Sequence, residues 1–175
     1  MEEDKRTFLR IPTNLRGRLR LLATDQELQL FREAPITSTS VSVMELKSAG
    51  VNEALVNALA GIDRKLDMLI SVHSQDNLLD DFPYPVRIGE ISGAGVKLTS
   101  TLPLEVGQMI ECVITLTQVP VRMAGIIGRV VRSEDVGGEP GWAVDFTRVR
   151  DRDLESIVQF VFQTQRDELR VKMWE

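Results

Sequence analysis

The chain has 175 residues, of which 43% are hydrophobic, 27% charged and 5% aromatic, and this composition is typical of a globular domain rather than a disordered chain. No apolar run is long enough to span a membrane, and the charged start lacks the apolar region of a secretory signal, so we expect a cytoplasmic protein. One cysteine and one histidine exclude a disulfide framework and a Cys/His zinc cluster.

The net charge of −5 conceals a basic segment near the N-terminus. Residues 5–24 contain six lysine and arginine residues and no acid, which gives this segment a charge of +6. An acidic chain with few aromatic residues is not expected to bind nucleic-acid polymers. The basic segment fits a localised anionic ligand, but charge alone favours a strand whose solvent face is rich in arginine.

Six short strands are predicted, over residues 12–23, 86–92, 95–99, 109–116, 123–132 and 142–146. The first alternates polar and apolar residues, as a half-buried strand does. The second and third are separated by a corner that contains glycine, which predicts a tight hairpin. Closely spaced strands with Gly and Pro at their turns are typical of an antiparallel barrel or sandwich.

A C-terminal helix is predicted from Asp151, with acids in its first turn and Arg166 and Arg170 near its end. Apolar residues recur on one face at helical spacing. We expect this face to cover an open end or face of the barrel. Its residues are Leu154, Ile157, Val158, Val161, Phe162 and Leu169.

A long helix is predicted between the first and second strands. Ser42 and Glu45 have the spacing of a capping box, which places the helix start near Met44. Further along, apolar residues recur in alternating steps of four and three, the heptad pattern of a coiled coil over about residues 44–76. The heptad residues are Leu55, Leu59, Ile62, Leu66 and Leu69.

Two interpretations fit this heptad stripe equally well by period alone, because it covers only about three heptads. It is either one amphipathic helix packed on its own domain or a seam between copies of the chain. The C-terminal helix already covers the barrel, so we favour self-association. Leucine at the a positions with apolar flanks favours three or four helices over two, and a homotetramer is the first expectation.

Three motifs follow one another along the chain. Arg6 to Arg10 form an RxxxR element ahead of the first strand, Glu90 to Gly95 form an ExSxxG hairpin, and Gly141 to Phe146 read GWAVDF. In this order, with the later helix that ends in QRDELR, they resemble the PilZ domain family, bacterial receptors for the second messenger cyclic di-GMP. The resemblance covers residues 5–23 and 84–170.

This resemblance implies a mostly β fold, a six-stranded antiparallel β-barrel with a C-terminal helix, into which the long coiled-coil helix is inserted. Residues 1–23 then form an N-terminal arm and the first strand, 24–83 form the helical insertion, and 84–175 form the rest of the barrel with its helix. The implied function is a bacterial signalling protein that binds cyclic di-GMP and acts through protein partners.

The family's ligand site joins the RxxxR arm to an (Asp/Asn)xSxxG hairpin, and the matching residues here are Arg6, Arg10, Glu90, Ser92 and Gly95. Arginine can bind a guanine edge or a phosphate in a bidentate way, and glycine lets the backbone approach the ligand. At Glu90 the chain departs from the pattern, because glutamate adds a methylene to the family's Asp or Asn. A misplaced buried hydrogen bond costs about 1–3 kcal/mol, or one to two orders of magnitude in affinity.

The alternative function is that of an oligomeric scaffold of the same fold that has lost the ability to bind cyclic di-GMP and works through protein contacts. In that case Arg6 and Arg10 are ordinary exposed charges and Glu90 is a solvated acid. An enzyme is not expected, because the chain has no P-loop, no HExxH sequence and no Gly-x-Ser-x-Gly elbow. No catalytic residue, metal or cofactor is expected, and cyclic di-GMP is the one candidate ligand.

Overall fold

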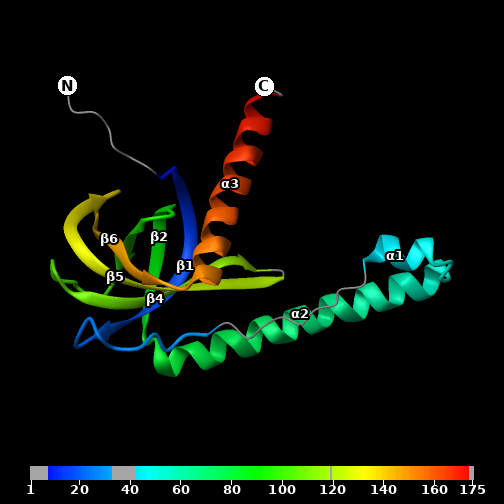
Figure 1. The fold of residues 1–175 in the computed structure, drawn as a ribbon, viewed down its shortest axis with the longest axis horizontal. Coiled ribbons are helices and arrows are strands. Elements are labelled where there is room, and N and C mark those ends of the chain that lie inside the picture. The colour runs from blue at the N-terminus through cyan, green and yellow to red at the C-terminus, as the bar shows by residue number, and fades with distance from the viewer. Residues whose placement is uncertain (1–7, 33–41, 119, 174–175) are drawn as a thin grey trace.

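The core of the protein is a β-barrel, and the computed structural model describes residues 8–32, 42–118 and 120–173. Its strands are β1 (Arg10–Leu22), β2 (Tyr84–Ser92), β3 (Gly95–Ser100), β4 (Met109–Gln118), β5 (Val121–Val136) and β6 (Glu139–Val149). They pair antiparallel and close in the order β1-β2-β3-β6-β5-β4 (Figure 1). The predicted mostly β class, with six antiparallel strands followed by a C-terminal helix, is confirmed.

The barrel interior is filled by branched aliphatic side chains from every strand. Burying such a side chain stabilises a fold by about 1.5–3 kcal/mol. Along β2, Val86 and Ile88 face inward, and the pairing register with β3 then shifts between Ile88 and Glu90. An extra residue in one strand reverses the alternation beyond it. Ile91 is therefore buried, and Glu90 lies on the outer side of the hairpin.

The turn between β5 and β6 follows from two glycines. Gly137 and Gly138 have φ angles of 64° and 88°, and positive φ at both central residues is what a two-residue hairpin turn requires. The Asp135 carboxylate accepts a hydrogen bond from the Gly138 amide at 2.7 Å. This tight turn lets both strands run several residues further than the predicted ranges 123–132 and 142–146, so that Pro140 lies within β6.

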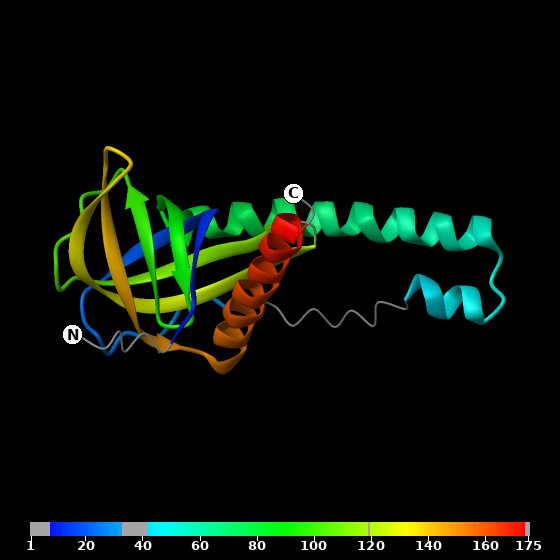
Figure 2. The same cartoon turned by 90° about the horizontal axis from the view of Figure 1, so that it is seen from above.

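The helical insertion differs from the prediction of one continuous helix starting near Met44. The capping box at Ser42 is present, but the helix that it starts, α1 (Val43–Ser48), is only six residues long. Gly50, with a φ of 76°, follows the end of α1. Asn52 then caps the second helix, α2 (Glu53–Asp81). Figure 2 shows α2 running away from the barrel with α1 folded back beside its N-terminal end.

The C-terminal helix α3 (Asp151–Met173) is only half covered. Ile157 and Val161 are buried against the barrel, as predicted, whereas Phe162 and Leu169 are 56% and 53% exposed. The second half of α3 extends beyond the barrel (Figure 1), which leaves those two side chains without cover within the described chain. None of the helices among the described residues is long and apolar enough to cross a membrane.

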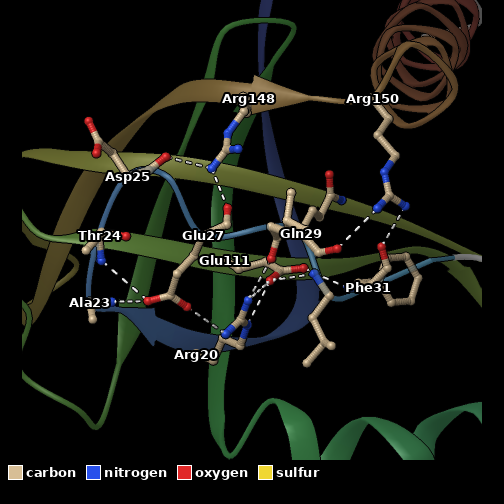
Figure 3. A network of polar contacts seen from close by, with 12 residues as sticks. Arg20, Ala23, Thr24, Asp25, Glu27, Gln29, Phe31, Glu111, Arg148 and Arg150 are labelled. Atoms are coloured by element: carbon tan, nitrogen blue, oxygen red, sulfur yellow. Dashed lines mark hydrogen bonds and ion pairs between the residues drawn. The ribbon is translucent and has the colours of Figure 1, made fainter.

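A buried carboxylate holds the segment after β1, residues 23–32, which we call the strap (Figure 3). Glu111 of β4 is 0% exposed. One of its oxygens accepts hydrogen bonds from Arg20 Nε at 2.8 Å and the Leu30 amide at 3.0 Å, and the other accepts from the Phe31 amide at 2.8 Å. Because a buried carboxylate needs such partners, these contacts fix where the chain leaves the barrel for the insertion.

Two further arginines hold the strap from the end of β6. Arg148 Nη2 donates to two strap carbonyls at 2.7 and 2.5 Å, and Arg150 donates to two more at 2.9 and 3.2 Å (Figure 3). The acceptors are the carbonyl oxygens of Asp25, Glu27, Phe31 and Gln29. These four strap carbonyls thereby have hydrogen-bond donors although the strap belongs to no sheet.

Candidate functional site

The motif residues that the structure describes meet at one end of the barrel. Arg10 opens β1 and stands in register with Ser92 at the end of β2, and Gly95 begins β3 directly after the hairpin turn. These three residues and Glu90 line one pocket. Arg6, the fifth predicted site residue, lies outside the described residues.

Ser92 and Gly95 have structural roles in the hairpin itself. The Ser92 hydroxyl accepts hydrogen bonds from the Ala94 and Gly95 amides and donates one to the Gly95 carbonyl, each at 3.2 Å. A Cβ atom added at Gly95 would lie 2.5 Å from the carbonyl oxygen of Val144, so only glycine fits there. The hairpin turn by itself therefore explains why serine and glycine occupy these two positions, whether or not a ligand binds there.

Glu90 lies between two cations. Its Oε1 is 3.7 Å from Arg10 Nη1, and its Oε2 is 3.5 Å from Lys97 Nζ. Lys97 also lies 3.4 Å from Glu134 of β5, which accepts a hydrogen bond from Arg132. These five residues form an alternating chain of charges that we call the motif network. Exposed pairs of this kind contribute about 0–1 kcal/mol each.

The charges of the motif network also act on Glu134. The hydrogen bond from the Arg132 guanidinium lowers the pKa of the Glu134 carboxyl, and the nearby Lys97 ammonium adds to the effect. Glu134 is thus held ionised to lower pH than an ordinary glutamate. Glu134, Lys97 and Arg132 belong to this site although no sequence motif identifies them. The pairing of Glu90 with Lys97 across the hairpin was a usable signal, since the hairpin itself had been predicted.

The motif network leaves little open space. The pocket that four of its residues share with Ser92 and Gly95 has a volume of about 40 Å³, and those four are Arg10, Glu90, Lys97 and Arg132. Pockets for small molecules are usually about 300–1,000 Å³. A dinucleotide placed at this pocket would meet the Arg10–Glu90 ion pair, and the Glu90 carboxylate would compete with it for that arginine. Among the described residues, no group of three His, Cys, Asp or Glu side chains is placed to hold a metal ion.

Phe8, which lies between the two arginines of the RxxxR element, packs on the β2–β3 hairpin. Phe8 lies over Gly93 at the tip of the β2–β3 hairpin, where an added Cβ would come within 2.8 Å of the phenyl ring and 3.5 Å of Val158 on α3. The missing side chain at Gly93 makes room for the ring. Phe8, the hairpin tip and Val158 of α3 thus lie close together around Gly93.

The heptad stripe on α2 is open to solvent. Its five residues are between 42% and 66% exposed, and the helix carries further exposed apolar residues beside them. Val56 is buried where α1 folds back on α2, but α1 reaches only the first turns of the longer helix (Figure 2). The stripe residues are Leu55, Leu59, Ile62, Leu66 and Leu69, and their exposed neighbours include Met68, Ile70 and Val72.

Comparison with known proteins identifies the fold. A sequence model of the PilZ domain matches residues 64–163. The inhibitor of motility MotI/DgrA from Bacillus subtilis has 10% identity and a TM-score of 0.53, and the match covers 94% of this chain and 53% of that one. This chain therefore spans about half the length of that protein. No curated protein matches the chain.

A second solved structure matches over nearly the whole of both chains. It is a pathogenic protein from Xanthomonas campestris, described as a tetrameric PilZ domain self-assembled via a helical bundle. The identity is 14% and the TM-score 0.55, with 94% of this chain and 91% of that chain covered. At such identities the two structures establish the fold alone, whereas the PilZ sequence model covers more than half of the chain. The chain belongs to the PilZ domain family.

Proposed function

We propose that this PilZ-domain protein is a signalling adaptor that assembles through α2 and acts by protein contacts, without depending on cyclic di-GMP. The observation that carries the proposal is the exposed heptad stripe, whose five residues are all at least 42% exposed in the single chain. Monomers rarely expose a continuous apolar surface of this kind. Packing the stripe against copies of itself removes it from water.

The number of copies follows from the width of the stripe. Apolar residues flank the a and d positions on α2, so the apolar surface is broader than a two-helix seam. A four-helix bundle buries such a surface on every helix. The Xanthomonas protein supports this choice, because it is described as a tetramer assembled via a helical bundle. Its match covers 94% of this chain and therefore includes most of the helical insertion.

The mass of the full chain in solution tests the assembly. Light scattering coupled to gel filtration is expected to give four times the 19.7 kDa of one chain. The mass should stay constant on dilution through the micromolar range, because burial of the stripe on four helices gives a tight complex. A mass of one chain at all concentrations would contradict the proposal.

A cyclic di-GMP receptor is the second candidate, and the observation that favours it is the meeting of Arg10, Glu90, Ser92 and Gly95 at one pocket. Calorimetric titration separates the two candidates. We expect the natural chain to bind weakly or not at all, because Glu90 holds Arg10 and Lys97. Glu90→Asp withdraws the carboxylate by one methylene, and we expect it to raise the affinity by about one to two orders of magnitude.

Glu134→Asp is the matched control for this titration, because it shortens a carboxylate of the same motif network outside the motif. This substitution should leave the affinity for cyclic di-GMP the same as that of the natural chain. Saturable binding by the natural chain at micromolar Kd, abolished by Arg10→Ala, would establish the receptor function in place of the nucleotide-independent one. The mass measurement is independent of this outcome.

A further inference from the structure

A second hollow lies on the outer face of the barrel, apart from the motif network. It is a groove of about 710 Å³ formed by β1, β2, β3 and the start of β6, and it shares no lining residue with the motif pocket. We call it the arginine groove, after Arg16 and Arg87 in its floor. Its volume is within the usual range of small-molecule sites.

The two arginines stand directly opposite each other. Arg16 of β1 and Arg87 of β2 are register partners, and both are exposed. Side chains at such positions begin about 4.5–5.5 Å apart, and like charges there destabilise a sheet. Within residues 8–32, 42–118 and 120–173, no ion pair or side-chain hydrogen bond satisfies either guanidinium. An anion bound between them would relieve this repulsion.

Other arginines of the same strand show the contrast. Arg18 donates to the Phe82 and Pro83 carbonyls at 2.5 and 2.6 Å, and Arg20 is bound to the buried Glu111. Those two guanidinium groups have evident structural roles. Arg16 lies on the same strand between Arg10 and Arg18, and its guanidinium makes no such contact with any residue that the structure describes.

The groove also supplies neutral donors suited to a phosphate. Thr99 of β3 is the register partner of Arg87, and Asn14 lies two residues before Arg16 on β1. The Ser100 hydroxyl accepts a hydrogen bond from the Leu102 amide at 3.1 Å, which leaves its own proton available to a ligand. Two guanidinium groups with hydroxyl and amide donors are the groups that bind phosphate oxygens in proteins.

A separate hollow of about 300 Å³ adjoins the arginine groove, and Arg16, Pro85 and Val86 line both. It lies between the end of α2 and the barrel, where Leu78 and Val113 make part of its wall apolar. We propose that the groove binds a small organic phosphate monoester. The phosphate lies between Arg16 and Arg87, and the carbon skeleton enters the adjoining hollow.

Phosphorus NMR on the full chain at constant ionic strength tests this site with two probes, inorganic phosphate and phenyl phosphate. The natural chain should broaden both signals in a saturable way. Phenyl phosphate should bind more tightly, because its ring can occupy the adjoining hollow. Absence of saturable broadening would overturn the site, and equal affinities for the two probes would overturn the assignment to an organic ester.

Exposed-residue variants locate the binding. Arg16→Gln and Arg87→Gln should each weaken phenyl phosphate binding at least about tenfold, because each removes a charge-assisted contact. Of the described residues that line the groove, Glu139 is the one acid, and Glu139→Gln should tighten binding. Arg129→Gln is the control, since it removes an exposed barrel arginine outside the groove.

Two results from these variants would contradict the proposal. An equal loss of binding in Arg129→Gln would show a general effect of net charge rather than a site. Binding that is lost in Arg10→Gln and retained in Arg16→Gln would place the anion at the motif network.

Discussion

Glu111→Ala is expected to lower the free energy of unfolding by about 3–5 kcal/mol, the range observed when one partner of a buried ion pair is removed. The Glu111 side chain is fully buried and accepts from Arg20 and from the amides of Leu30 and Phe31. Alanine leaves these donors without an acceptor and the Arg20 charge without its closest carboxylate, at 2.7 Å. The strap should then detach from the barrel.

Urea unfolding at fixed protein concentration measures this effect, since the stability of an oligomer depends on concentration. Glu111→Gln keeps the shape but turns one acceptor into a donor, so an intermediate loss is expected. Glu27→Ala is the matched control, because Glu27 also pairs with Arg20, at 3.2 Å, but its side chain is 33% exposed. It should have a much smaller effect. A stable Glu111→Ala variant would show that the strap does not depend on this carboxylate.

Glu111 also shows what the sequence could have predicted. The strand that contains it was predicted from its apolar composition, and a lone glutamate inside the run MIECVI was an available signal of a buried, paired acid. The identity of its partners was not available. The strap has no periodic pattern, and its amides reach Glu111 only because β1 and β4 pair in the closed barrel.

The strands were predictable and the break in the insertion was predictable in part. Val86 and Ile88 alternate with polar residues, and period-two patterning identifies such strands directly. In the insertion, the heptad steps suggested one helix from Met44, although Gly50 and Asn52 are ordinary signals for a helix end and a new N-cap. The Asn52 side chain accepts from the Ala54 amide at 2.8 Å, as an N-cap does.

The full set of residues in the motif network could be identified only from the closed barrel. Arg10 and Glu90 were found from the motif, and Lys97 follows from the hairpin register. Arg132 and Glu134 come from β5, which reaches the hairpin only through β6. The proposed loss of nucleotide dependence rests on that three-dimensional set of charges, so the motif sequence alone could not decide it.

Leu66→Glu is expected to dissociate the proposed tetramer into single chains. In the heptad pattern Leu59 and Leu66 take the a positions and the other three stripe residues the d positions. The Leu66 side chain is 51% exposed in the single chain. In a four-helix seam the substitution places four carboxylates close together, away from water, and removes four leucines that contribute about 1.5–3 kcal/mol each when buried. Light scattering should then give the 19.7 kDa of one chain. An unchanged tetramer would show that α2 is not the seam.

Arg64→Glu is the matched control, because it also introduces a glutamate on α2 but at an f position, which faces solvent in a heptad bundle. It should keep the mass of the natural chain. The barrel should stay folded in both variants, because α2 packs on the barrel through its C-terminal end, away from Leu66 and Arg64. Phe82 packs there with Phe31 and Val113, and Leu78 lies against the same cluster. Circular dichroism of the dissociated chain should therefore retain the barrel signal, which separates loss of assembly from loss of fold.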